Sequence, residues 1–171
     1  MAGSVHALAH GETLTPNALY AAIGGALLAF MIWIGYFDRA RAQQERDINL
    51  PGMGRNLRLW AYAHVPLYIG IAGLAAGTVY LANHADLHGT VQQLFAWAVT
   101  LVMLGLSLLG AASGSTGIGP TWKRAAPHIA IGAVFIVVVG NLDFGSVVYV
   151  YLAAISGFAL QLFVARLSDK K

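Results

Sequence analysis

Long apolar stretches are the feature of this sequence that most limits its fold. Three of them, at residues 17–37, 59–83 and 91–113, reach the length of about 20 residues that an α-helix needs to cross a bilayer. A further apolar region follows Lys123 and Arg124, and the polar turn around Asp143 divides it into residues 125–141 and 146–165. The sequence therefore predicts an all-α fold with a single membrane domain over residues 1–171, a bundle of five transmembrane helices.

The basic residues predict how this bundle is oriented. All 10 Lys and Arg residues come after the first, third or fifth stretch, and the segments at the opposite ends of the stretches contain none. Because cytoplasmic loops carry an excess of Lys and Arg, we expect the N-terminus outside and the C-terminus in the cytoplasm. The chain is thus predicted to be a multi-pass protein of the bacterial cytoplasmic (inner) membrane, surrounded by lipids.

Composition excludes several kinds of chemistry. Only 10% of the residues are charged, against about 25% in soluble domains, so the net charge of +3 marks topology and predicts no nucleic-acid partner. The absence of cysteine excludes disulfides and thiolate sites. No paired carboxylates, activated nucleophile or phosphate-binding loop lies at membrane depth. We therefore expect no enzymatic activity and no catalytic residue.

Small residues form a stripe along the second stretch. Ala63, Gly70, Gly73 and Gly77 recur at helical spacing and predict a seam for close helix packing. Pro66 lies on the same stripe and removes a backbone hydrogen bond, which predicts a kink. Polar residues within the spans are expected to form interhelical hydrogen bonds or caps, among them Gln92 and Gln161.

Histidines are the candidates for ligand binding. His64 lies in the second stretch and His128 near the start of the fourth, both on the predicted cytoplasmic side. The pair is therefore a candidate for binding a haem or pigment. The alternative is that each is bonded to a backbone carbonyl or reaches the interface. Four more histidines form two i, i+4 pairs in the predicted outer segments: His6 with His10, and His84 with His88. They are either a Zn or Cu site or solvated loop residues.

Two motifs resemble a known family. Residues 33–38 read WIGYFD, and residues 62–71 read YAHVPLYIGI. With an Arg-bearing loop between them and Arg124 before the closing helix pair, they resemble the bacterial low temperature requirement A (LtrA) family over residues 18–171; Ile32 stands where a second Trp is common. The resemblance implies a match to the C-terminal half of longer members and carries over no substrate. It singles out these positions: Trp33, Tyr36, Phe37, Asp38, Tyr62, His64 and Gly70.

Three functions follow from these observations. The first is a non-catalytic accessory or structural subunit that packs against a larger respiratory or photosynthetic membrane complex. The second is a half-size or oligomeric transporter of small solutes or ions, in which Asp38, Tyr62 and His64 line a vestibule and Pro66 opens the helix. The third is binding of haem, pigment or metal through histidines. The expected partners are membrane lipids and either other membrane subunits or further copies of the chain.

Overall fold

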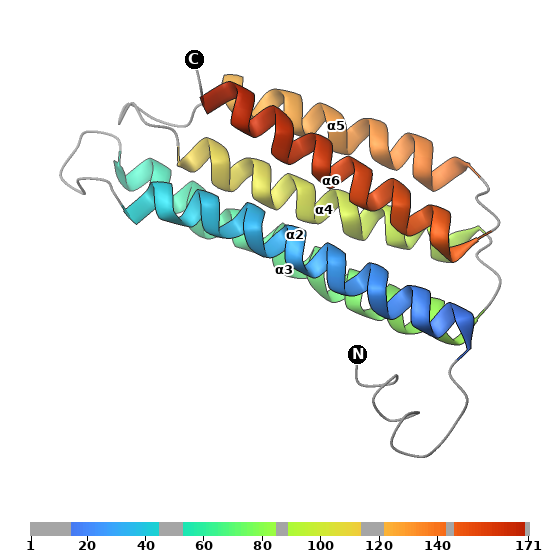
Figure 1. Ribbon diagram of the computed structural model, residues 1–171. Coiled ribbons are helices and arrows are strands. Elements are labelled where there is room, and N and C mark those ends of the chain that lie inside the picture. The colour runs from blue at the N-terminus through green and yellow to red at the C-terminus, as the bar shows by residue number, and fades with distance from the viewer. Residues whose placement is uncertain (1–14, 45–52, 85–88, 114–121, 143–145, 170–171) are drawn as a thin grey trace.

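The computed structural model describes residues 15–44, 53–84, 89–113, 122–142 and 146–169, and each regular element in this part of the chain is an α-helix (Figure 1). The helices are α2 (Pro16–Gln44), α3 (Met53–Asn83), α4 (Thr90–Ala112), α5 (Trp122–Asn141) and α6 (Val147–Asp169). The predicted all-α class with five helices is confirmed. α2 ends later than residue 37 and α3 begins earlier than residue 59, because helix-favouring Arg, Ala, Leu and Gln residues extend both helices beyond their apolar parts.

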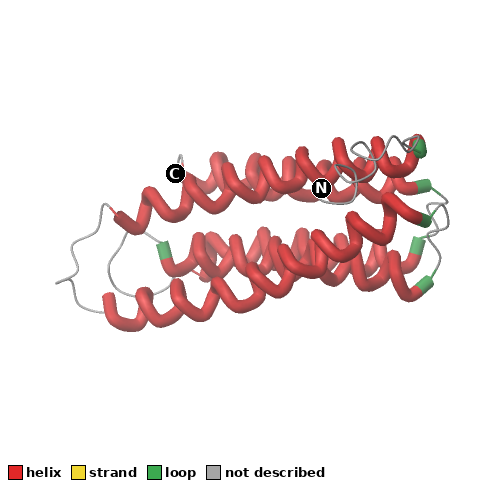
Figure 2. The backbone as a smooth tube through the Cα atoms, turned by 90° about the horizontal axis from the view of Figure 1, so that it is seen from below, coloured by secondary structure: helices red, strands yellow, loops and turns green. Residues whose placement is uncertain are grey.

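The helices run side by side along a common direction (Figures 1 and 2). α4 lies between the α2–α3 pair and the α5–α6 pair and contacts each of the other four helices. In α4, 61% of the apolar span is buried inside the bundle, against 22% in α3. α4 is therefore the centre of the bundle, and α3 is the span with the most uncovered surface.

Among the described residues, four helices are long and apolar enough to cross a membrane: Pro16–Ala40, Gly54–Asn83, Thr90–Ala112 and Val147–Val164. α5 differs because its apolar part, Ile129–Asn141, is shorter than the about 20 residues of a full span. Its first turn contains Lys123 and Arg124, and Pro127 lies inside the helix. The fourth predicted span is thus present as a helix whose first part is too polar for the hydrocarbon core.

Glycines bring α3 and α4 into backbone contact. A methyl group added to Gly70 of α3 would lie 2.7 Å from the backbone N of Val102, and one added to Gly105 of α4 would lie 2.9 Å from the backbone N of Leu67. Without side chains at these positions the two backbones can approach closely. The structure places further members of the predicted stripe on or near this seam: Gly73, Gly77 and the fully buried Ala63.

Two buried glutamines connect α4 to its neighbours. Gln92 Nε2 donates to the carbonyl oxygen of Val139 at 2.6 Å and also to that of Leu142. Gln161 Nε2 donates to Met103 O and Ser107 Oγ, both at 3.0 Å. The expected interhelical hydrogen bonds are confirmed, and such bonds contribute on average about 0.6 kcal/mol each in membrane proteins.

One end of the bundle carries the described basic residues. The last turns of α2, α4 and α6 and the first turns of α3 and α5 lie together at this end (Figure 1). Arg39 belongs to α2, and Arg55 and Arg58 belong to the first turns of α3. This placement agrees with the one-sided charge pattern, and the cytoplasmic orientation of this end stays a prediction.

Candidate functional site

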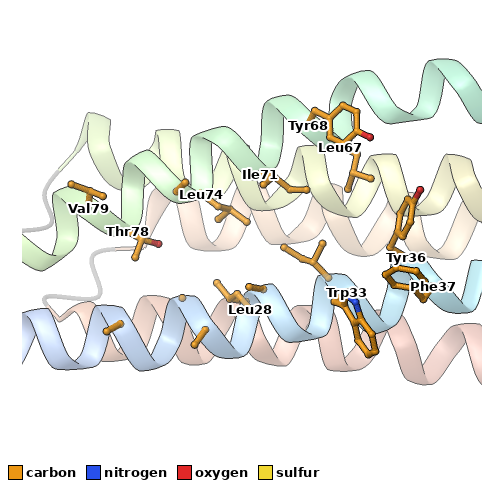
Figure 3. A pocket seen from close by; sticks show the side chains of 16 residues that line it. Leu28, Trp33, Tyr36, Phe37, Leu67, Tyr68, Ile71, Leu74, Thr78 and Val79 are labelled. Atoms are coloured by element: carbon orange, nitrogen blue, oxygen red, sulfur yellow. The ribbon is translucent and has the colours of Figure 1, made fainter. Parts of the chain in front are cut away.

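A groove of about 770 Å³ lies between α2 and α3 (Figure 3). Its α2 wall contains the small residues Ala22, Gly25, Ala26 and Ala29, and the side chains of the α3 residues Leu67, Leu74 and Thr78 point toward α2. Since the small side chains reach only a short way across, space remains between the two helices. Hereafter this cavity is called the α2–α3 groove.

Aromatic side chains gather at one end of the α2–α3 groove. Trp33, Tyr36 and Phe37 come from α2 and Tyr68 comes from α3 (Figure 3). The ring centroids of Trp33 and Phe37 are 5.1 Å apart, and those of Tyr36 and Phe37 are 5.3 Å apart with an edge-to-face geometry. Trp33, Phe37 and Tyr68 are more than half exposed, so this end opens on the outer surface of the bundle.

His64 lies beside this aromatic end and hydrogen bonds to both sides. Its Nδ1 donates to the backbone carbonyl of Trp60 at 2.8 Å, and its Nε2 lies 3.3 Å from the hydroxyl of Tyr36. Because a carbonyl oxygen only accepts, Nδ1 carries the proton and Nε2 accepts from the Tyr36 hydroxyl. The structure therefore brings together two of the predicted site residues, Tyr36 and His64, and joins α2 to α3 through them.

Unpartnered polar atoms lie on the same face of α3, one and two turns from His64. Among the described residues, the indole Nε1 of Trp60 and both side-chain amide atoms of Asn56 are buried without a hydrogen-bond partner. The rings of Trp60 and His64 are in edge contact, with centroids 4.3 Å apart. The aromatic end thus leads to a buried polar region in the first turns of α3.

Three helices meet near the opposite end of the α2–α3 groove. Tyr151 of α6 donates its hydroxyl hydrogen to Thr78 Oγ1 of α3 at 2.9 Å. Gly24 of α2 lies directly against the Tyr151 ring, and a methyl group on Gly25 would be 3.1 Å from Thr78 Cγ2. The paired glycines therefore let α2 approach both α3 and α6 at this point.

Arg39 is a buried cation near the aromatic end. It is 8% exposed, and its Nη1 donates to the carbonyl oxygen of Gly35 at 2.6 Å. A methyl group on Gly110 would lie 3.3 Å from Arg39 Nε, and Ser113 Oγ donates to Arg39 O at 3.2 Å. The guanidinium therefore sits by the C-terminal turn of α4, where the helix dipole favours a positive charge.

Other predicted site residues are not gathered with His64. Tyr62 is 71% exposed on the outer surface of α3, Asp38 is also exposed, and neither bonds to His64 within the described part of the chain. Pro66 is half-buried in α3, which continues through it as one helix. The three proposed vestibule residues, Asp38, Tyr62 and His64, therefore do not line one space.

Only some of the histidines proposed as ligands can be compared with the structure. His128 lies on α5, its side chain is outside the described residues, and α4 lies between α3 and α5. His84 is exposed, and its Nδ1 donates to Tyr80 O at 3.1 Å. The other outer histidines, His6, His10 and His88, lie outside the described residues. Within the residues searched, no group of three His, Cys, Asp or Glu side chains is placed to hold a metal.

Three features of this region did not follow from the sequence: the α2–α3 groove, the buried Arg39 and the unpartnered Asn56. A signal for the groove was present, since Ala22, Ala26 and Ala29 recur at helical spacing on α2. What sequence could not supply is that Ala75 of α3 lies on the same groove. Whether a small-residue stripe packs or leaves space depends on the partner helix.

The helices define the class of this protein, and a comparison of the sequence with family models gives its family. In the described part of the chain, four apolar helices of spanning length, one of which is the buried central helix α4, are the architecture of a multi-pass helical membrane protein. The model of the family described as "Bacterial low temperature requirement A protein (LtrA)" matches residues 2–165, and the chain belongs to this family. The match begins earlier than the resemblance at residues 18–171 and includes residues before the first span. Neither the curated proteins nor the solved structures gave a match.

Proposed function

We propose that this LtrA-family protein is a non-catalytic accessory subunit that packs beside another protein in the bacterial cytoplasmic membrane. The observation that supports the proposal is a stripe of mainly small residues on the outer face of α3. We define this outer face as the exposed residues Ala61, Val65, Ile69, Ala72 and Ala76, which recur at spacings of three and four. Alanines at this spacing let a second helix approach closely.

The outer surface of α2 has a different character. Four of its exposed residues also recur at helical spacing, and each of these four has a large side chain: Leu19, Ile23, Leu27 and Phe30. Lipid tails are as apolar as these side chains, so apolar exposure alone gives no drive for helices to associate. Association of helices in the membrane then depends on close packing, and the small residues on the outer face of α3 allow it. α3 also has the least buried span of the four, which leaves this surface uncovered.

The accessory role is favoured over transport by the placement of polar groups. A transporter needs polar side chains that converge on a passage, whereas Tyr62 and Asp38 are exposed and do not contact His64 in the described chain. A haem held by two histidines needs His64 and His128 to face one space, whereas α4 lies between α3 and α5, the helices that carry them. The outer face of α3 is already exposed, so a helix of another protein can pack against it without a rearrangement of the bundle.

Site-directed crosslinking tests the proposed contact. The chain has no cysteine, so each single-cysteine variant carries one reactive thiol. Ala72→Cys, labelled in native membranes with a benzophenone maleimide and irradiated, should give an adduct heavier than the 18.0 kDa chain that contains a second protein. Mass spectrometry of the adduct identifies that protein.

The matched control is Leu160→Cys, at a residue of α6 that is 50% exposed. It should react with lipid and give no discrete protein adduct. Equal protein adducts from both variants would show random collision and contradict the proposal. An Ala72→Cys product made only of two copies of this chain would replace the accessory role with a homodimer.

A further inference from the structure

The α2–α3 groove has the dimensions of a binding site for one slim chain. At 1.5 Å per residue, its lining from Ala22 to Phe37 covers about 22 Å of α2. The volume of about 770 Å³ then gives a mean width of roughly 7 Å, whereas a helix with its side chains is about 10–12 Å across. A single hydrocarbon chain fits along a groove of this width, whereas a partner helix can rest only on its open side.

The two parts of the α2–α3 groove differ in chemistry. The part nearer Thr78 is lined by small and aliphatic side chains, whereas Trp33, Tyr36, Phe37 and Tyr68 surround the other end (Figure 3). Aromatic rings favour a flat, conjugated partner because their faces and edges can stack on it. This end lies near Ala40, where the apolar span of α2 stops, so a head group would sit close to the membrane surface.

The polar group at the aromatic end can turn toward a ligand. The distance of 3.3 Å between the Tyr36 hydroxyl and His64 Nε2 is longer than usual for a hydroxyl donor. A carbonyl oxygen of a ligand can therefore replace Nε2 as the acceptor at small cost. The lining includes no charged side chain, so it offers nothing to neutralise a phosphate head group.

We infer that the α2–α3 groove binds a neutral amphiphile of the isoprenoid-quinone class. The flat head ring lies among Trp33, Tyr36 and Tyr68 and accepts a hydrogen bond from the Tyr36 hydroxyl. The single isoprenoid tail follows the small-residue wall from Ala29 toward Thr78. A two-chain phospholipid fits less well, because the groove has room for one chain and no counter-charge. This site is separate from the outer face of α3 and does not depend on the accessory role.

Quenching of tryptophan fluorescence tests the inference in purified protein. The probe is a benzoquinone with a ten-carbon tail, and Trp33 is the reporter because it lines the aromatic end. Saturable quenching is expected, and Trp33→Phe should remove most of it. Ala29→Phe, which fills the tail region, should weaken binding about tenfold or more. Tyr36→Phe keeps the ring and should weaken it about threefold to tenfold, the range of one hydrogen bond.

Controls separate binding from loss of fold. Ala159→Phe adds the same side chain at an exposed position of α6 and should leave the affinity unchanged. Ala75→Phe fills the groove from α3 and replaces Ala29→Phe if that variant does not fold, as judged by its melting temperature. Equal quenching in the groove and control variants would overturn the inference. So would equal affinity for a quinone without a tail, or native mass spectra showing a phospholipid that Ala29→Phe releases and the quinone does not displace.

Discussion

Arg39 shows how single side chains hold the ends of this bundle together. It comes from the last turns of α2, is buried against Gly35 and Gly110, and accepts a hydrogen bond from Ser113 at its backbone. A buried cation is tolerated only where its N–H groups find hydrogen-bond acceptors and nearby dipoles favour its charge. Glycines at positions 35 and 110 leave room for the guanidinium, which connects α2 to the C-terminal end of α4.

Replacing Arg39 should therefore loosen the bundle. Arg39→Leu is expected to lower the free energy of unfolding by about 1.5–3 kcal/mol, the range for hydrogen bonds to charged groups. Arg39→Lys should lose less, because it keeps the charge near the α4 terminus but cannot reproduce the planar fork. Denaturant titration in detergent micelles measures both. A change of less than about 0.5 kcal/mol for Arg39→Leu, within the scatter of ordinary surface substitutions, would contradict this role.

Individual residues were predictable where their chemistry is rare in a membrane. His64 stood out because an ionisable group at membrane depth needs a partner. Its bond to a backbone carbonyl, that of Trp60, was one of the alternatives left open by the sequence, whereas Tyr36 did not follow from the sequence because it is distant in the chain. Tyr62 and Asp38 share the same motifs as His64 and Tyr36 but are exposed, since neighbours in sequence occupy different faces of a helix.

At the scale of elements, the α3–α4 seam is a close helix contact that can be tested against a matched control. Gly70→Ala places a methyl group 2.7 Å from both Val102 N and Val102 Cγ2, so α4 must shift. Such overpacking should cost about 1–3 kcal/mol of unfolding free energy. The control is Gly132→Ala on α5, whose added methyl group meets its nearest neighbour at an ordinary 3.6 Å.

Gly132→Ala should be neutral or more stable by up to about 1 kcal/mol, because alanine favours the helix over glycine. Melting temperatures in one detergent compare the two variants directly. If both variants lose the same stability, the loss comes from replacing any glycine in the bundle. The stability would then not depend on the close approach of α3 and α4.

Helices were predictable from the length of the apolar stretches, while their boundaries and spaces were not. Hydropathy marks only the part inside the hydrocarbon core, so the polar ends of α2 and α3 were missed. The α2–α3 groove arises because Gly24 and Gly25 approach Tyr151 and Thr78 while Ala26 and Ala29 face open space. That difference depends on the crossing of two helices, which spacing along one sequence does not contain.

For the whole molecule, the one-sided charges and the helix order agree. The chain alternates between the two ends of the bundle, and the described basic residues lie at one end (Figure 1). The centre is α4, and the two candidate surfaces, the α2–α3 groove and the outer face of α3, lie on the opposite side from α5. Both proposed contacts with other molecules therefore lie on the α2–α3 side of the bundle.

The mass of the native particle tests the accessory role most directly. The tagged protein should be extracted from its own membranes in a mild detergent and examined by native mass spectrometry. We expect a particle heavier than the 18.0 kDa chain that contains at least one different membrane protein, and loss of that protein when Ala72 on α3 is replaced by Phe. A particle made of this chain alone, or of copies of it, would contradict the accessory role.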